Sequence, residues 1–185
     1  MINEKELVKA CLNNDSAAQK ALYKLFASKM LGVCLRYTTN KMEAEDVLQD
    51  GFIKVFKYLS EYKFNGSLEG WVRKIMVNTA LNNYKSNLKR SFHVDINEIH
   101  ESMITTDIRS ENLSEKDLLK LIQELPDGYR MVFNLYAIEG YSHKEIGDKL
   151  GISENTSKSQ LSRARVALQN KLGEYKNDSV LQKTQ

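Results

Sequence analysis

The chain has 185 residues, 42% hydrophobic and 28% charged, as expected for a folded protein of one or two small domains. It contains one proline and nine glycines, which favours long helices over a fold with many turns. No apolar run reaches the roughly 20 residues that cross a bilayer, and the polar, acidic N-terminus excludes a secretory signal, so we expect a cytoplasmic protein that is not inserted in a membrane.

The net charge of +3 is unevenly distributed along the chain. Segments 69–90 and 154–171 are basic, whereas segment 91–117 between them is acidic. This pattern favours two modules that face a polyanion and are joined by an acidic connector.

The residues that could support chemistry are scattered. Cys11 and Cys34 lie far apart on apolar helix faces, so we expect small buried side chains rather than a disulfide or a metal pair. His93, His100 and His143 lack ligand spacing, which predicts no metal and no cofactor. Without a nucleophile–base pair or a phosphate-cradling glycine loop, we expect no enzymatic activity and no small-molecule substrate.

The N-terminal half predicts three packed helices, enough for one small domain. The first spans 16–37, with the apolar residues Leu22, Leu25, Phe26, Met30, Val33, Cys34 and Tyr37 on its inner face. The second, 41–62, starts at Asn40 with Glu43 and buries Leu48, Phe52, Val55, Phe56 and Leu59. The loop KFNGS, 63–67, separates it from the third, 68–89, with core residues Trp71, Ile75, Ala80 and Leu81.

Apolar periodicity fades over 91–112, which predicts an extended and partly mobile linker. Helicity resumes after a capping pair, Ser114 and Asp117, with the apolar residues Leu118, Leu119, Ile122 and Leu125. After the turn at Pro126, a further apolar face ends at Gly140 and contains Val132, Phe133 and Tyr136.

Residues 141–168 predict a helix-turn-helix. Ser142 and Glu145 form a capping box, Gly151 supplies the turn, and Ser153 caps the second helix. On that helix we expect Ser157, Leu161, Ala164 and Leu168 to face inward. The opposite face carries short polar side chains and cations suited to DNA: Asn155, Lys158, Ser159, Ser162 and Arg163, flanked by Arg165.

The helix at 41–62 has a different outer face. Asp46, Gln49, Asp50 and Ile53 fall largely outward on it. DNA would repel such an acidic face, whereas a basic protein surface would attract it.

These features closely resemble the bacterial group IV (extracytoplasmic function) sigma factors over about residues 15–90 and 114–172. The similar motifs are EDVLQD with Phe52, Trp71 with Ile75 and NTA, LP with Arg130, and SHKEIGDKLGIS. The resemblance implies an all-α fold with two small domains on a flexible tether. Its bounds would be sigma domain 2 at 1–90, an acidic linker at 91–113, the helix-turn-helix sigma domain 4 at 114–176, and a tail at 177–185.

The resemblance also implies partners and site residues. Core RNA polymerase would be bound through its β′ clamp helices by Asp46, Gln49, Asp50 and Ile53, and through its β flap. The promoter −10 element would be opened with a base flipped from the non-template strand. The residues that would contact it are Asn65, Gly66, Ser67, Trp71, Arg73, Lys74, Asn78 and Lys85. Of these, we expect Trp71 to pack in the core rather than to stack on a base. The −35 element would be read by Asn155, Lys158, Ser159, Ser162, Arg163 and Arg165.

Family members are typically held by an anti-sigma factor until a signal releases them, so such a factor is a further implied partner. The linker would thread the polymerase channel, and neutralising its acids should alter the yield of abortive transcripts. Three positions depart from the family pattern: Phe64 replaces a common glycine, Ser157 a branched aliphatic residue, and Gln160 an arginine.

Two other functions fit parts of the sequence. A stand-alone DNA-binding regulator would tolerate the loss of Asp46 and Asp50. A sigma-like decoy for an anti-sigma factor would tolerate the loss of Lys158 and Arg163.

Overall fold

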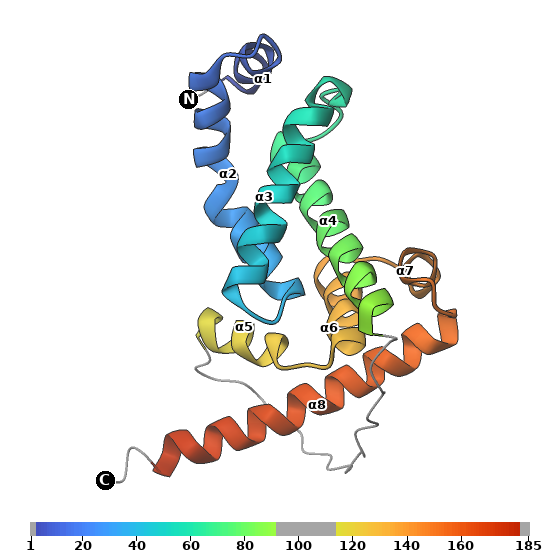
Figure 1. Cartoon of the computed structure of the whole chain (residues 1–185). Helices are drawn as coiled ribbons and strands as arrows, with labels where there is room; N and C mark the ends of the chain where they lie inside the picture. The colour runs from blue at the N-terminus through green and yellow to red at the C-terminus, as the bar shows by residue number, and fades with distance from the viewer. Residues whose placement is uncertain (1–2, 92–113, 182–185) are drawn as a thin grey trace. The chain divides into compact units, whose positions relative to one another are not determined.

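The computed structural model describes residues 3–91 and 114–181, and every regular element in these ranges is helical (Figure 1). This confirms the all-α fold class. The chain forms two compact units, Met1–Asn83 and Tyr84–Gln185, and the division falls within one long helix. The predicted linker, apart from its first residue, lies outside the described ranges, as do His93 and His100.

The N-terminal unit is built from helices of which the first three pack on one another in chain order. They are α1 (Glu4–Leu12), α2 (Ser16–Tyr37), α3 (Lys41–Tyr58), the 3₁₀ turn η1 (Leu59–Glu61) and the first part of α4 (Leu68–Ser91). Helix α1 packs on α2, and α2 packs on α3. The Met76 side chain of α4 fills the space beside Gly51 of α3, so a larger residue at position 51 would force Met76 to move.

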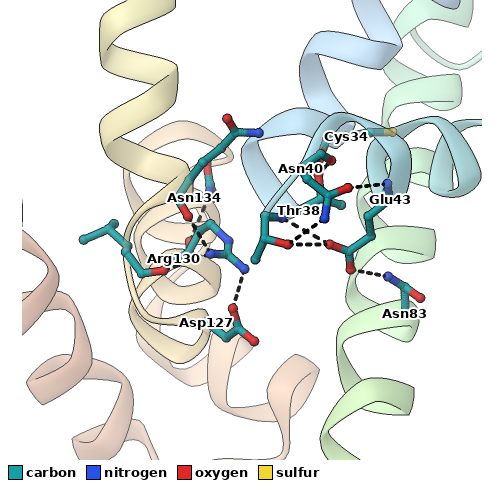
Figure 2. Close-up of polar contacts among 11 residues, drawn as sticks. Cys34, Thr38, Asn40, Glu43, Asn83, Asp127, Arg130 and Asn134 are labelled. Atoms are coloured by element: carbon teal, nitrogen blue, oxygen red, sulfur yellow. Dashed lines mark hydrogen bonds and ion pairs between the residues drawn. The ribbon is translucent and has the colours of Figure 1, made fainter. Parts of the chain in front are cut away.

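Side-chain caps fix where the helices of this unit begin. Asn40 Oδ1 accepts a hydrogen bond from Glu43 N at 2.9 Å, which confirms the predicted start of α3. The Glu43 carboxylate in turn accepts from Thr39 N at 3.1 Å and from Asn83 Nδ2 at 2.9 Å (Figure 2). One carboxylate therefore ties the start of α3 to α4.

The core of the N-terminal unit follows the predicted faces except for shifts on α2 and α4 and for Phe56 of α3, which is only half-buried. Leu25 was expected inside but is 44% exposed, because the buried stripe of α2 continues from Leu22 through Phe26 and Leu25 lies one residue off it. On α4, Trp71 and Ile75 are only half-buried. The buried stripe there is made by Leu68, Val72, Met76, Val77, Ala80 and Leu81.

Both cysteines are buried and neither forms a disulfide, as predicted. Burial raises the pKa of the Cys34 thiol to about 12, and burial followed by the nearby Asp15 charge raises that of Cys11. Both thiols therefore stay protonated and serve as small apolar side chains.

The C-terminal unit contains the second set of helices. After the end of α4 these are α5 (Glu115–Gln123), α6 (Asp127–Phe133), the π-helix η2 (Asn134–Ile138), α7 (His143–Leu150) and α8 (Glu154–Leu181). Helices α6 and α7 pack on α8. The predicted cap at Ser114 is confirmed, because Asp117 N donates a hydrogen bond to Ser114 Oγ at 3.2 Å. Two leucines of α5 are less buried than predicted: Leu118 is 45% exposed and Leu119 is half-buried.

A buried arginine joins α5 to α6. The side chain of Arg130 is 3% exposed, and its Nη1 donates to the carbonyls of Gln123 at 3.0 Å and Leu125 at 2.8 Å. Its other terminal nitrogen pairs with Asp127 (Figure 2). A cation at the carboxyl end of a helix satisfies free carbonyls and complements the helix dipole, so Arg130 holds the turn at Pro126 closed.

The turn between α7 and α8 is tight enough to require glycine twice. Gly151 has φ +73°, and a Cβ at Gly147 would lie 2.7 Å from the carbonyl oxygen of Ile152. Ile152 N also donates to Gly147 O at 3.1 Å, so the backbone of the turn lies directly against α7. This approach sets the angle between the two helices.

We expect Gly147→Ala to lower the free energy of unfolding by about 1–3 kcal/mol, because the added methyl group meets backbone that cannot move aside. Gly32→Ala is the matched control: a Cβ there meets nothing within 4 Å, so alanine should raise stability by about 0.5–1 kcal/mol through its helix propensity. Urea denaturation followed by circular dichroism measures both. A Gly147→Ala variant as stable as the parent chain would contradict the close approach.

Candidate functional site

The exposed face of α8 is made of the six predicted side chains. Ser157, Leu161, Ala164 and Leu168 are all buried, at 0%, 4%, 0% and 7% exposure, which confirms the predicted inner face. The outward residues are all exposed: Asn155, Lys158, Ser159, Ser162, Arg163 and Arg165. A helix that buries one face completely and presents hydroxyls, an amide and cations on the other can enter a DNA groove.

The caps of the helix-turn-helix are formed as predicted. Ser142 N donates to Glu145 Oε2 at 2.8 Å, and Glu145 N donates to Ser142 Oγ at 3.3 Å, so both halves of the capping box are present. Ser153 Oγ accepts from Thr156 N at 3.0 Å at the start of α8. These caps hold the first turns of α7 and α8 in place.

Lys158 is paired within its own helix. Its Nζ lies 2.7 Å from Glu154 Oε1, one turn earlier. The hydrogen bond and charge of Lys158 lower the pKa of Glu154, which therefore stays ionised. A phosphate that binds Lys158 has to compete with this carboxylate.

His143 has a structural partner that the sequence reading missed. Its Nδ1 lies 3.0 Å from the hydroxyl of Ser157, and its ring stacks on Tyr136 at 4.5 Å. The Arg165 guanidinium lies 5.9 Å from the same Tyr136 ring. A serine on the inward face of a helix needs a hydrogen-bonding partner, and that need was the available signal.

The acidic face of α3 is exposed as predicted. Asp46, Gln49, Asp50 and Ile53 share one side of the helix because they are spaced three, four and seven residues apart. Ile53 is 65% exposed, and nearby in sequence Met42 is 73% exposed. Carboxylates around an exposed apolar side chain suit a protein surface that is basic at its rim and apolar at its centre.

The loop between η1 and α4 is closed by a hydrogen bond from the phenol of Tyr62. Tyr62 Oη donates to Gly66 O at 2.8 Å, and Gly66 has φ +103°. Asn65, Gly66 and Ser67 are all exposed, as their predicted role requires. Ser67 Oγ accepts from Gly70 N at 3.1 Å, which fixes the loop onto the start of α4.

The predicted residues of α4 divide into two groups. Trp71, Lys74, Asn78 and Lys85 follow one stripe at spacings of three, four and seven residues. Lys74 is exposed and the other three are half-buried. Arg73 falls off this stripe, above the buried residues Val77 and Ala80.

Two negative findings apply to the described part of the chain. Within residues 3–91 and 114–181, no group of three or more His, Cys, Asp or Glu side chains could hold a metal ion. None of the helices in those ranges is long and apolar enough to span a bilayer.

Two segments match known families. Residues 22–90 match the family described as Sigma-70 region 2, and residues 115–168 match the family described as Sigma-70, region 4. The first match covers α3, the loop and α4, and the second covers the helix-turn-helix. All three candidate surfaces therefore lie within the matched segments: the exposed face of α8, the acidic face of α3, and the loop with the α4 stripe.

Curated relatives match over nearly the whole chain. The RNA polymerase sigma-H factor of Pseudomonas aeruginosa is 25% identical over 176 residues, 89% of this chain and 91% of that protein. The ECF RNA polymerase sigma-E factor of Escherichia coli is 25% identical over 182 residues, 92% of this chain and 95% of that protein. The fold is similar to that of the sigma factor RpoE, solved in complex with the anti-sigma factor NepR from Bartonella quintana, with a TM-score of 0.51, 24% identity, and coverage of 83% of this chain and 96% of that one.

The capping box predicts a specific pH dependence. Hydrogen bonds from the Ser142 side chain and backbone lower the pKa of Glu145, so the folded state binds this proton less tightly than the unfolded state. The stabilisation is complete above the unfolded pKa and is lost as the pH falls through the lowered value. We expect Glu145→Gln to reduce the loss of stability between about pH 6 and about pH 3, measured by urea denaturation. Asp148→Asn, an exposed carboxylate on the same helix, is the control, and an equal effect of the two variants would contradict the assignment.

Proposed function

The chain belongs to the sigma-70 family as a group IV (extracytoplasmic function) sigma factor that directs transcription initiation, and we propose that it divides this task among the three surfaces described above. The C-terminal unit reads the −35 element of the promoter. The N-terminal unit binds core RNA polymerase and opens the −10 element.

The exposed face of α8 is the observation that carries this proposal. The inward residues of α8 are buried, so its outward hydroxyls, amide and cations share one exposed face of the helix. Ser159 and Ser162 are short enough to let the helix approach base edges, and Arg163 can reach guanine or a phosphate. The His143–Ser157 contact and the close approach at Gly147 hold α8 against α7.

The acidic face of α3 supports the assignment of core polymerase as a partner. Asp46 and Asp50 would repel DNA, whereas Ile53 offers an apolar contact at 65% exposure. We assign this face, with Gln49, to the β′ clamp helices. The β flap is assigned to the C-terminal unit.

The loop and the stripe of α4 support a single-strand contact at the −10 element. The Asn78 amide can pair with the edge of an extruded base through both its donor and its acceptor. Lys74 and Lys85 lie on the same stripe and can follow the phosphates, whereas Arg73 would reach them only around the side of the helix. Asn65, Gly66 and Ser67 form the rim of this region.

An anti-sigma factor is the further proposed partner, supported by the similarity to a sigma factor solved in such a complex. Polymerase supplies the catalysis, so the chain itself needs no catalytic residue and no small-molecule substrate. Because polymerase and promoter are the proposed partners, we propose that the protein acts in the cytoplasm.

Run-off transcription with bacterial core polymerase on a pool of genomic promoter fragments tests the whole proposal. Transcripts that depend on the protein and share spaced −35 and −10 sequences would support it. Core binding without such transcripts would favour the decoy, and DNA binding without core binding would favour the stand-alone regulator.

For the polymerase surface, we expect Asp46→Asn combined with Asp50→Asn to lower the affinity for core polymerase about tenfold or more, because two charge contacts are lost. Binding of the labelled full chain to core polymerase measures this. Glu6→Gln, an exposed acid on α1, is the control and should bind like the parent. Unchanged affinity in the double variant would rule out this face.

For the reading surface, we expect Lys158→Ala and Arg163→Ala each to reduce run-off transcription and −35 protection about fivefold or more, while capture of core polymerase is retained. Lys20→Ala on α2 removes the same charge from an exposed site with no assigned role. A reading variant that transcribes like Lys20→Ala would remove that residue from the interface.

A further inference from the structure

Phe64 combines an exposed aromatic ring with a backbone that favours glycine. Its φ is +58°, and the residue is 43% exposed at the tip of the loop between η1 and α4. Glycine would adopt this φ without strain, so the turn itself gives no reason for an aromatic side chain. The loop keeps the ring at the surface despite the strained backbone.

The ring of Phe64 continues a row of aromatic side chains. Its centroid lies 4.8 Å from that of Tyr62, whose own centroid lies 5.5 Å from that of Trp71. Trp71 begins the α4 stripe that continues with Lys74 and Asn78. The row therefore leads from the proposed strand-binding stripe to an exposed ring at the loop tip.

The surroundings of Phe64 are polar and charged: burial and then the charge of Glu4 raise the pKa of the neighbouring Tyr62, and two lysines lie close to the ring of Phe64. Lys5 Nζ lies 6.0 Å from the centroid of the ring, and the exposed Lys63 and Asn65 are its neighbours in the chain. An aromatic platform flanked by cations is the arrangement with which proteins hold unpaired nucleic-acid strands.

We propose that Phe64 is a stacking platform for an unpaired base of the promoter strand, additional to the contacts of the α4 stripe. The inference rests on the proposed function of this unit in opening DNA. A phenyl ring has no hydrogen-bonding group, so it adds affinity and favours bases with a large face without reading base edges. Phe64 is therefore a further strand-binding residue of this chain.

The test uses the full chain bound to core polymerase and the single-stranded −10 region of a promoter found by run-off transcription. We expect Phe64→Leu, which keeps an apolar side chain but removes the aromatic face, to weaken strand binding about fivefold or more, measured by fluorescence anisotropy. Phe64→Tyr keeps the aromatic face and should bind within about twofold of the parent. Phe64→Gly relieves the strain, so it should remain folded by circular dichroism and bind as weakly as Phe64→Leu.

A scan of abasic sites along the same strand locates the base. At one position the loss of the base should weaken binding by the parent chain but leave Phe64→Leu unchanged, because the partner of the ring is already gone. Equal strand binding by the parent and Phe64→Leu, or the absence of any such position, would overturn the inference while leaving the proposed function in place. Loss of core-polymerase binding in Phe64→Leu would also overturn it, in favour of a protein contact. If the parent chain drives no transcripts at all, the proposed function and the inference fail together.

Discussion

The exposed face of α8 depends on one contact, the close approach of the turn backbone to Gly147. Because Ile152 O lies against α7 where only a hydrogen fits, α8 leaves the turn in one direction and lays Ser157 and Leu161 into the core. That burial leaves Lys158, Ser159 and Ser162 outside. The exposed face is therefore a consequence of packing at the turn, supported by the side-chain caps of the two helices.

The acids of the α3 face and most of the cations proposed to meet DNA lie on different helices. The acidic face of α3 surrounds Ile53, whereas the cations lie along the α4 stripe and on α8. A single mixed surface would bind neither a protein nor DNA well, because each partner would meet repelling charges. In the proposed function, this separation lets one short chain contact polymerase and promoter at once.

The local rules predicted most of the fold and much of the site. Helix 16–37 was predicted with its observed bounds, and the caps at Asn40, Ser142 and Ser153 were read correctly because capping depends on neighbouring residues alone. Leu25 and Trp71 were predicted to be more buried than they are, because the periodicity of apolar residues defines the buried face only to within one position. The left-handed backbone of Phe64 opposes the preference of its residue type, so local rules do not predict it. For the His143–Ser157 pair, the sequence signalled only that the inward Ser157 needs a partner, and it did not single out a residue 14 positions away.

The ion pair between Lys158 and Glu154 bears on how salt affects promoter binding. When an unpaired surface lysine binds a DNA phosphate, cations condensed on the DNA are released to the medium. Such a lysine has no ion pair of its own to break first. Lys158 must first exchange an internal carboxylate, which stays ionised beside the DNA and holds a counterion of its own. The entropy gained from released counterions is smaller for this contact than for an unpaired lysine, so the affinity of α8 for its site depends less steeply on ionic strength than its positive charge would suggest.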